Sequence, residues 1–258
     1  MNGNRLSIIK RVIALALCVG ALPLINSARA YAGEAVGLTY GVKATVQTGY
    51  LWRGLNAGAM NMQASADVGY GGLYINAWWN IGTLDWTFKH FQPEVDLTLG
   101  FSRWGVDVSE TLIHNFNCGL FDFTNHPDGG NALEVDLRYT VSDRIPLSIL
   151  WGTRVTASDG YMRGNDTIRA YSTYIEISYT KRMRDGFSLY GAIGMTPWRS
   201  LYTHYQGAFA VHNIDLRVRK DWDVSAHCGM MVQGQLMINP VAATEMIIPN
   251  IGLGVYLK

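Results

Sequence analysis

Polar side chains recur at every second position in several apolar segments of the chain. In residues 133–141, Leu133, Val135 and Leu137 alternate with Glu134 and Asp136. Because successive side chains of a strand point to opposite faces, such a segment gathers its carboxylates on one face and its aliphatic groups on the other. Charged groups arranged in this way can hold water and ions, or they can pair with one another.

The same alternation predicts a larger set of polar side chains that share one face of the strands. The candidate lumen-lining residues are Lys43, Gln47, Asp67, Glu94, Asp96, Asp107, Glu134, Asp136, Arg138, Arg154, Glu176, Asp215, Arg217 and Arg219. The acids cluster in the middle of the chain, and two arginines stand together near residue 218. Two interpretations stay open. Opposed charged walls around a water-filled lumen would set the solute preference, or the charges pair and fill a closed interior.

Hydrolytic and metal chemistry find little support in the sequence. None of the six histidines belongs to a His-x-Ser pair, the spacing that would place both groups on one face of a strand. Only His114 could meet a nucleophile such as Ser109 or Thr111 near a strand end. No His or Cys pair has zinc-site spacing, and nothing resembles a calcium loop. We therefore expect neither an enzyme nor a cofactor, with a lipid hydrolase as the alternative.

The first thirty residues have the three parts of a secretory signal. A basic front of Arg5, Lys10 and Arg11 precedes an apolar stretch over 12–25, and Ala28-Arg29-Ala30 supplies a cleavage site. We expect a signal peptide over 1–30 and a single exported domain over 31–258. Removing the leader takes away four basic residues and no acids, so the exported domain is mildly acidic.

The composition narrows the class of protein further. The chain has 258 residues, of which 48% are hydrophobic and 16% charged, against about 25% charged in a typical globular protein. The hydrophobic content excludes intrinsic disorder. A formal net charge of +1 offers no electrostatic footprint for nucleic acid. Together with 28 glycines and many aromatic residues, these numbers indicate β-structure in an apolar solvent.

Period-two alternation predicts twelve strands and no helix. After residue 33 no run of 18 apolar residues occurs, which excludes a membrane-spanning helix. The predicted strands cover 36–52, 61–70, 73–82, 94–102, 106–115, 132–142, 146–157, 169–181, 187–196, 208–219, 224–238 and 249–257.

The links between these segments alternate strictly in length. Short turns are expected at 71–72, 103–105, 143–145, 182–186 and 220–223, and longer links at 53–61, 83–93, 116–130, 158–168, 197–207 and 239–248. Outer-membrane barrels have this pattern, with an even strand number, short periplasmic turns and longer outer loops. A secreted β-sandwich would also alternate along its strands, but it has no reason to sort its loops by length. The sequence thus predicts an all-β, transmembrane, antiparallel up-and-down β-barrel of about twelve strands with both termini periplasmic.

Three further features belong to this prediction. The loop over 116–130, with Phe116, Phe121 and Phe123, either folds inward and narrows the lumen or packs at the rim. Tryptophans near strand ends are expected to form interfacial girdles; these are Trp78, Trp79, Trp86, Trp104, Trp151, Trp198 and Trp222. Cys118 and Cys228 fall near opposite ends of the barrel, so we expect two free thiols.

The last strand alternates hydrophobic residues up to Leu257, a pattern that outer-membrane assembly machinery reads. Here Lys258 follows, where a terminal Phe is usual.

Residues 49–80 carry a family resemblance. The segment contains Gly49-Tyr50, Trp52-Arg53-Gly54, Gln63, Asp67, Gly72-Leu73-Tyr74 and Ala77-Trp78. In these pieces the chain resembles the start of the TorF-type porin family of small outer-membrane barrels. The resemblance covers about an eighth of the chain. It implies a barrel and a pore, and it supplies no catalytic residues.

These observations together favour a channel in the outer membrane of a Gram-negative bacterium. We expect passive diffusion of small polar or ionic solutes through the lumen. The expected partners are outer-membrane lipid, these solutes and the assembly machinery, and no nucleic acid. Besides the lipid hydrolase, the alternative is a closed structural or surface-binding barrel whose function lies in its loops.

Overall fold

The computed structural model describes residues 37–83, 93–116, 118–123, 130–155, 159–207, 209–242 and 244–257. Several predictions fall outside this part of the chain. They concern the signal peptide over 1–30, the loop residues Trp86, His90 and His126, and the C-terminal Lys258.

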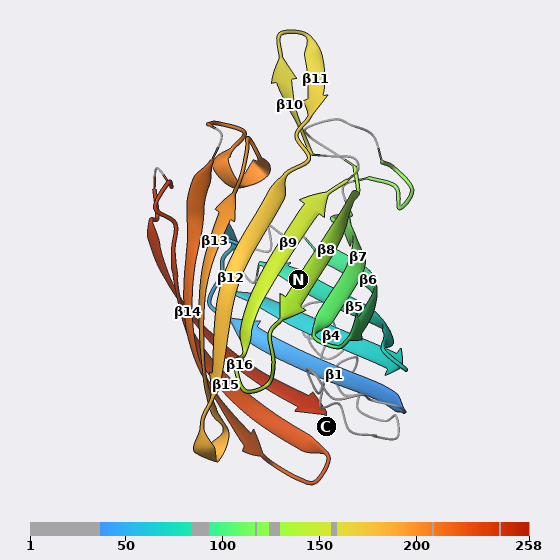
Figure 1. Ribbon diagram of the computed structural model, residues 1–258, viewed down its shortest axis with the longest axis vertical. Helices are drawn as coiled ribbons and strands as arrows, with labels where there is room; N and C mark the ends of the chain where they lie inside the picture. Colours follow the sequence, from blue (N-terminus) through green and yellow to red (C-terminus); the bar gives the residue numbers. More distant parts are fainter. Residues whose placement is uncertain are drawn as a thin grey trace, which may run out of the picture.

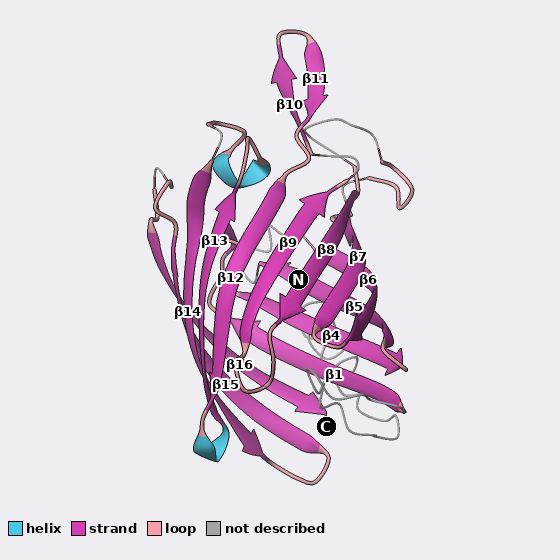
Figure 2. Cartoon of the chain, in the orientation of Figure 1, coloured by secondary structure: helices cyan, strands magenta, loops and turns pink. Residues whose placement is uncertain are grey.

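Twelve strands form one closed antiparallel barrel, as the alternation predicts (Figures 1 and 2). Each strand pairs with its neighbours in the chain, and β1 pairs with β16 to close the sheet. The strands are β1 (Leu38–Gln47), β4 (Asn61–Tyr70), β5 (Leu73–Thr83), β6 (Glu94–Arg103), β7 (Val106–His114), β8 (Ala132–Thr140), β9 (Leu147–Arg154), β12 (Thr173–Arg182), β13 (Phe187–Thr196), β14 (Ala210–Asp223), β15 (Cys228–Ile238) and β16 (Ile247–Leu257).

Smaller elements occupy the links. Two separate hairpins form from β2 (Tyr50–Trp52) with β3 (Leu55–Gly58), and from β10 (Gly160–Arg163) with β11 (Asp166–Arg169). The β10–β11 hairpin projects beyond the barrel at the end with the long links (Figure 1). Short 3-10 turns, η2 (Arg184–Gly186) and η3 (Leu201–Thr203), lie at opposite ends.

In the described part of the chain, no helix has the length and apolar character needed to cross a membrane.

Several predicted strand boundaries are wrong by a few residues, and two of these errors change the path of the chain. The first predicted strand, 36–52, stops contributing to the barrel at Gln47, because the chain then turns into the separate β2–β3 hairpin. The predicted turn at 220–223 is strand, since β14 continues to Asp223 and pairs Trp222 with Met230. At the first place the alternation is lost in Tyr50-Leu51-Trp52. At the second, the consecutive charged residues 219–221 resemble a turn although they are strand.

The two faces of the barrel differ sharply in polarity. One outward row of the sheet runs from Leu99 through Glu110 to Val135. Apart from Glu110, this row and the outward positions next to it are apolar. Outward leucines such as Leu99 and Leu253 remain 59% and 60% exposed. Side chains one residue away point inward, where hydrogen bonds link polar groups from different strands. A water-soluble barrel would bury its apolar face, and this one exposes it.

Glycines make room for tyrosine rings on the inner face. A Cβ atom added at Gly194 would lie 2.3 Å from the Tyr174 hydroxyl oxygen, and one added at Gly100 or Gly229 would collide with the ring of Tyr74 or Tyr256 in the same way. The absence of a side chain at these positions lets each ring lie flat against the sheet.

We expect Gly194→Ala to destabilise the barrel by about 1–3 kcal/mol, because the methyl group would displace the ring of Tyr174. Gly234→Ala is the matched control, since an added Cβ there meets nothing within 4 Å. Urea unfolding of the protein in lipid vesicles, followed by tryptophan fluorescence, measures both free energies of unfolding. Equal losses in the two variants would contradict this packing explanation.

Candidate functional site

A hairpin between β1 and β4 enters the barrel. We call residues 48–60, which include β2 and β3, the inner hairpin. Its turn consists of Arg53 and Gly54, both with left-handed backbone conformations, at φ 47° and 85°. Asn-Gly is the usual pair at such a turn, and a left-handed non-glycine residue costs about 1–3 kcal/mol. Contacts of the Arg53 side chain must therefore compensate for the conformation of its backbone.

The inner hairpin spans the full width of the barrel. It begins and ends at β1 and β4, which are neighbours in the closed sheet. Its turn contacts Glu134 on β8, the ring of Tyr174 on β12 and the backbone at His212 on β14. In the strand order, β12, β9 and β8 form the wall opposite β1 and β4. The turn thus reaches the far wall.

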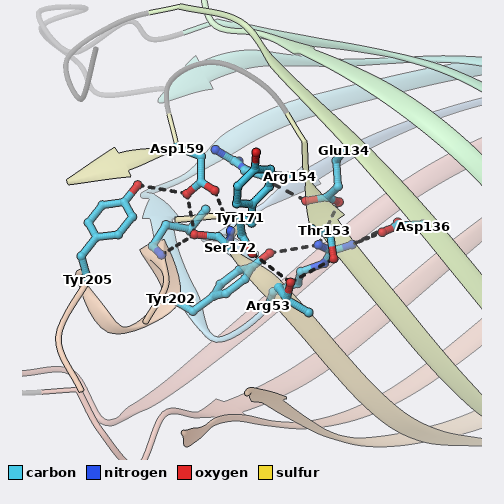
Figure 3. A network of polar contacts seen from close by, with 12 residues as sticks. Arg53, Glu134, Asp136, Thr153, Arg154, Asp159, Tyr171, Ser172, Tyr202 and Tyr205 are labelled. Carbon is cyan, nitrogen blue, oxygen red and sulfur yellow. Dashed lines mark hydrogen bonds and ion pairs between the residues drawn. The ribbon is translucent and has the colours of Figure 1, made fainter. Parts of the chain in front are cut away.

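Arg53 is held there by a dense set of contacts (Figure 3). Its Nη1 lies 2.8 Å from Glu134 Oε1 and donates a 3.0 Å hydrogen bond to the Tyr202 hydroxyl, while Nη2 lies 3.1 Å from Asp136 Oδ2. The guanidinium carbon is 4.8 Å from the centre of the Tyr174 ring and 5.1 Å from that of Trp52. The side chains of Arg53 and Glu134 are only 11% and 5% exposed. Charge pairing and cation–π contact act here together with little water.

Arg53 remains positively charged in this setting. Burial alone would lower the pKa of its guanidinium, but the carboxylate of Glu134, the Tyr202 hydroxyl and the carboxylate of Asp136 outweigh it and hold that pKa well above its usual value.

Other contacts attach the inner hairpin to the wall along its length. The Tyr50 hydroxyl donates a 2.6 Å hydrogen bond to Glu94 Oε1 on β6. The Gly54 carbonyl accepts a 2.9 Å hydrogen bond from the amide of Asn239, and the Gly49 N–H donates to Asn250 Oδ1 at 3.0 Å. Both backbone and side-chain groups of the hairpin are thus hydrogen bonded to the barrel.

Outer links position Tyr202 over the inner hairpin. Asp159 accepts hydrogen bonds from the backbone N–H and the hydroxyl of Ser172, at 2.6 and 2.5 Å. The Ser172 hydroxyl in turn accepts from the N–H of Leu201, beside Tyr202 (Figure 3). Burial and the nearby carboxylate of Asp159 raise the pKa of Tyr205 to about 12, so its hydroxyl stays a neutral donor to Asp159. This network fixes the η3 turn against β12.

A histidine at a bulge completes the packing on Tyr202. The pairing of β13 with β14 shifts register between Gly194 and Met195, opposite His212. His212 is fully buried and stacks on the Tyr202 ring, with centres 4.8 Å apart and planes 6° from parallel.

Four of the predicted acids lie around the inner hairpin. Glu134 and Asp136 hold Arg53, and Glu94 holds Tyr50. Asp96 lies on the same inward face of β6 as Glu94, two residues away. Its Oδ1 atom is buried and accepts no hydrogen bond from the residues described. The predicted Arg154 lies 3.9 Å from Glu134 and 5.4 Å from the Trp52 ring centre. The structure therefore brings five predicted residues to one place.

The remaining predicted residues form smaller groups. Gln47 and Asp215 belong to a chain of hydrogen bonds that runs from Gln63 through Gln47, Asn250 and Gln235 to Asp215. Asp107 accepts from the Tyr74 hydroxyl at 3.0 Å. Glu176 accepts from two tyrosine hydroxyls at 2.7 Å, with Arg138 3.9 Å away. Lys43 and Asp67, on the neighbouring strands β1 and β4, are partly exposed.

The two arginines of β14 do not form an open basic wall. Arg217 pairs with Asp215, and Arg219 lies 2.6 Å from Asp221, each two residues away on the same face of the strand. The inward charges could either line a water-filled lumen or pair with one another, and these two arginines are paired. The spacing of two residues between each Asp and its Arg is the sequence signal for this pairing.

For the loop over 116–130, the described part agrees with the second alternative, packing at the rim. Phe121 is 86% exposed there, and the Asn131 amide donates to the carbonyls of Gly119 and Leu120. The segment that turns inward is the one around Arg53. One expectation about the tryptophans is wrong. Trp78 points inward and packs against Tyr50 at 5.5 Å, so it does not belong to an outer girdle.

The structure does not assemble a hydrolytic site at His114. Its Nδ1 lies 2.6 Å from Asn131 Oδ1, while the hydroxyl of Thr111 shares a hydrogen bond with Thr98. Among the residues described, no cluster of His, Cys, Asp and Glu has the arrangement of a metal site. Cys118 and Cys228 are both free thiols, as expected.

Sequence reasoning missed the residues that bring the site together: Arg53, Tyr174, Tyr202 and His212. It placed Arg53 at the start of an outer link and did not assign His212. The one available signal was Trp52-Arg53-Gly54, within the segment that carries the family resemblance.

Comparisons with known proteins identify barrels of similar outline. No protein-family model and no curated protein matches the chain. Among solved structures, an outer membrane channel from Pseudomonas putida F1 is 12% identical, with 90% of this chain and 99% of that chain covered and a TM-score of 0.46. The KdgM porin is 8% identical, with 85% and 98% covered and a TM-score of 0.43. At these values the functional inference rests on the residues of this chain.

We expect Gly54→Ala to loosen the inner hairpin, because the added Cβ would lie 2.2 Å from the His212 carbonyl oxygen. Hydrogen–deuterium exchange should become faster in peptides covering residues 48–60. Gly164→Ala, at the tip of the β10–β11 hairpin, is the control, since it carries the same strain at φ 67° but meets no atom within 4 Å. Unchanged exchange in Gly54→Ala would argue against tight docking of the turn.

Proposed function

We propose that the barrel spans the outer membrane of a Gram-negative bacterium, with both termini and the short turns on the periplasmic side. The support is the exposed outer face, which is aliphatic over most of its height and has Trp104 and Trp222 near one end and Trp151 and Trp198 near the other. Apolar bands flanked by aromatic residues are what a bilayer solvates. In this setting the assembly machinery would read the last strand.

Glu110 is the exception on this outer face. It sits in the middle of β7 between Leu99 and Val135, and among the described outward positions of the twelve barrel strands it is the one carboxylate. Acidic groups facing lipid carry an energetic cost that depends on their depth.

Glu110→Leu should therefore stabilise the protein in lipid vesicles by up to about 2 kcal/mol. Leu99→Glu, the reverse change at the paired position, should destabilise it by a similar amount. Urea unfolding in vesicles gives both free energies. A loss of stability in Glu110→Leu would count against a lipid-facing β7.

We further propose that the barrel is a narrow channel for passive diffusion of small polar or ionic solutes. The observation that carries this proposal is a polar, charged interior that the inner hairpin crosses. A segment that crosses the interior at one level would narrow a lumen there. The predicted residues would line the path, which the inner hairpin constricts. Four carboxylates against Arg53 and Arg154 at this level favour cations over anions.

A closed barrel is the second candidate. The hydrogen-bonded chain from Gln63 to Asp215 and the contacts of Arg53 with the far wall favour it, because they fill part of the interior.

Conductance in planar bilayers distinguishes the two candidates. The protein should give discrete, cation-selective steps. Replacing residues 51–58 by a short Gly-Ser linker should raise the step size several-fold, because it removes the constriction. The same replacement of residues 161–168, in the projecting β10–β11 hairpin, is the control and should leave the steps unchanged. A folded barrel that stays silent with and without residues 51–58 would establish the closed alternative.

A further inference from the structure

The groups around the Arg53 guanidinium form a defined binding site. We call it the guanidinium cage, and it consists of Glu134, Asp136, Tyr174 and Tyr202. It offers two carboxylates to the N–H groups, a hydroxyl oxygen as a further acceptor, and an aromatic face 4.8 Å from the guanidinium carbon. Planar, multidentate N–H donors and a stacking face are the properties that distinguish guanidinium from other cations.

The cage belongs to the barrel and not to the inner hairpin. Glu134 and Asp136 are on β8, and Tyr174 is on β12. The Tyr174 hydroxyl is held independently of Arg53, because it donates to Glu176 and accepts from the Asn213 amide, both at 2.7 Å. Tyr202 is held by its stacking on His212. The two tyrosines are therefore preorganised whether or not Arg53 occupies the cage.

Acidic groups outnumber basic ones around the cage. Glu94 and Asp96 line the same side of the interior as Glu134 and Asp136, and Arg154 is the second cation nearby. Without Arg53, four carboxylates would face one guanidinium. Glu134 Oε2, on a side chain only 5% exposed, accepts no hydrogen bond from the residues described. A vacated cage would thus attract a replacement cation strongly.

Arg53 reaches the cage from a strained turn. Its left-handed backbone conformation costs free energy, which the contacts of the side chain in the cage offset. Near the turn, the described residues make two further hydrogen bonds between the hairpin and the rest of the protein. The Gly54 carbonyl accepts from the Asn239 amide, and the Asn56 amide donates to Glu245.

We infer that Arg53 is a tethered ligand and that the guanidinium cage is a binding site for solutes bearing a guanidinium group, which enter by displacing Arg53 and move the inner hairpin out of the path. The binding step stands on the cage alone, and the opening step rests on the proposed channel function.

The first experiment restores an absent guanidinium. In Arg53→Ala, millimolar guanidinium chloride should raise the melting temperature of the detergent-solubilised protein, and urea, a neutral molecule of the same shape, should not. The unsubstituted protein should bind guanidinium at least about ten-fold more weakly, because the tethered Arg53 competes at a high effective concentration.

The matched control removes the cage charges. Arg53→Ala combined with Glu134→Gln and Asp136→Asn should lose the response to guanidinium. Equal responses in this variant and in Arg53→Ala, or no response in either, would overturn the inference. Heat-modified gel mobility checks that each variant is folded. If Arg53→Ala does not fold without ligand, the test becomes recovery of folding yield with guanidinium and not with urea, and the lack of such recovery overturns the inference.

Bilayer recordings separate the two levels of the proposal. L-Argininamide added to the unsubstituted channel should lengthen its open periods, and L-lysinamide should do so more weakly. If guanidinium stabilises Arg53→Ala but the barrel never conducts, the channel function is refuted and the binding site in the guanidinium cage is supported. Normal conductance without any binding to the cage would refute the tethered-ligand role alone.

Discussion

Closure of the sheet between β1 and β16 is the constraint on which the rest of the structure depends. With every barrel strand paired on both sides, no strand edge is left with unpaired backbone groups, and the chain can place its apolar face outward. The same closure creates an interior in which polar side chains must find partners. The tyrosines lying over glycines and the hydrogen-bonded chain from Gln63 to Asp215 are two ways in which this interior satisfies them.

Arg53 adds a second level of organisation across that interior. A single cation joins β8, β12 and the η3 turn to a hairpin that starts on the opposite wall. Its backbone strain is offset by charge pairing in a setting with little water, where each contact is worth more than at the surface. The outer network of Asp159 and Ser172 holds Tyr202 in place, so this side of the cage is fixed independently of the hairpin.

In the proposed channel, selectivity and closure would depend on the same group of residues. The carboxylates that hold Arg53 are also the ones that a permeating cation would meet. A solute able to compete for them would be both the preferred cargo and the signal that opens the path. By contrast, the arginines of β14 pair with Asp215 and Asp221 on their own strand, whereas the acids around Arg53 lie on β6 and β8.

Alternation along the chain was enough to determine the fold class and the twelve strands, and with them the sorting of short and long links. It also determined the face on which Glu134, Asp136 and Arg154 lie. These properties depend on neighbours one or two residues apart, and period two is a local signal. The partners of Arg53 could not be read in this way, because Asp136 and Tyr202 are 83 and 149 residues distant. Only the closed barrel brings them together, since its curvature sets which strands face each other across the lumen. The inward position of residues 48–60 was therefore decided by tertiary structure alone.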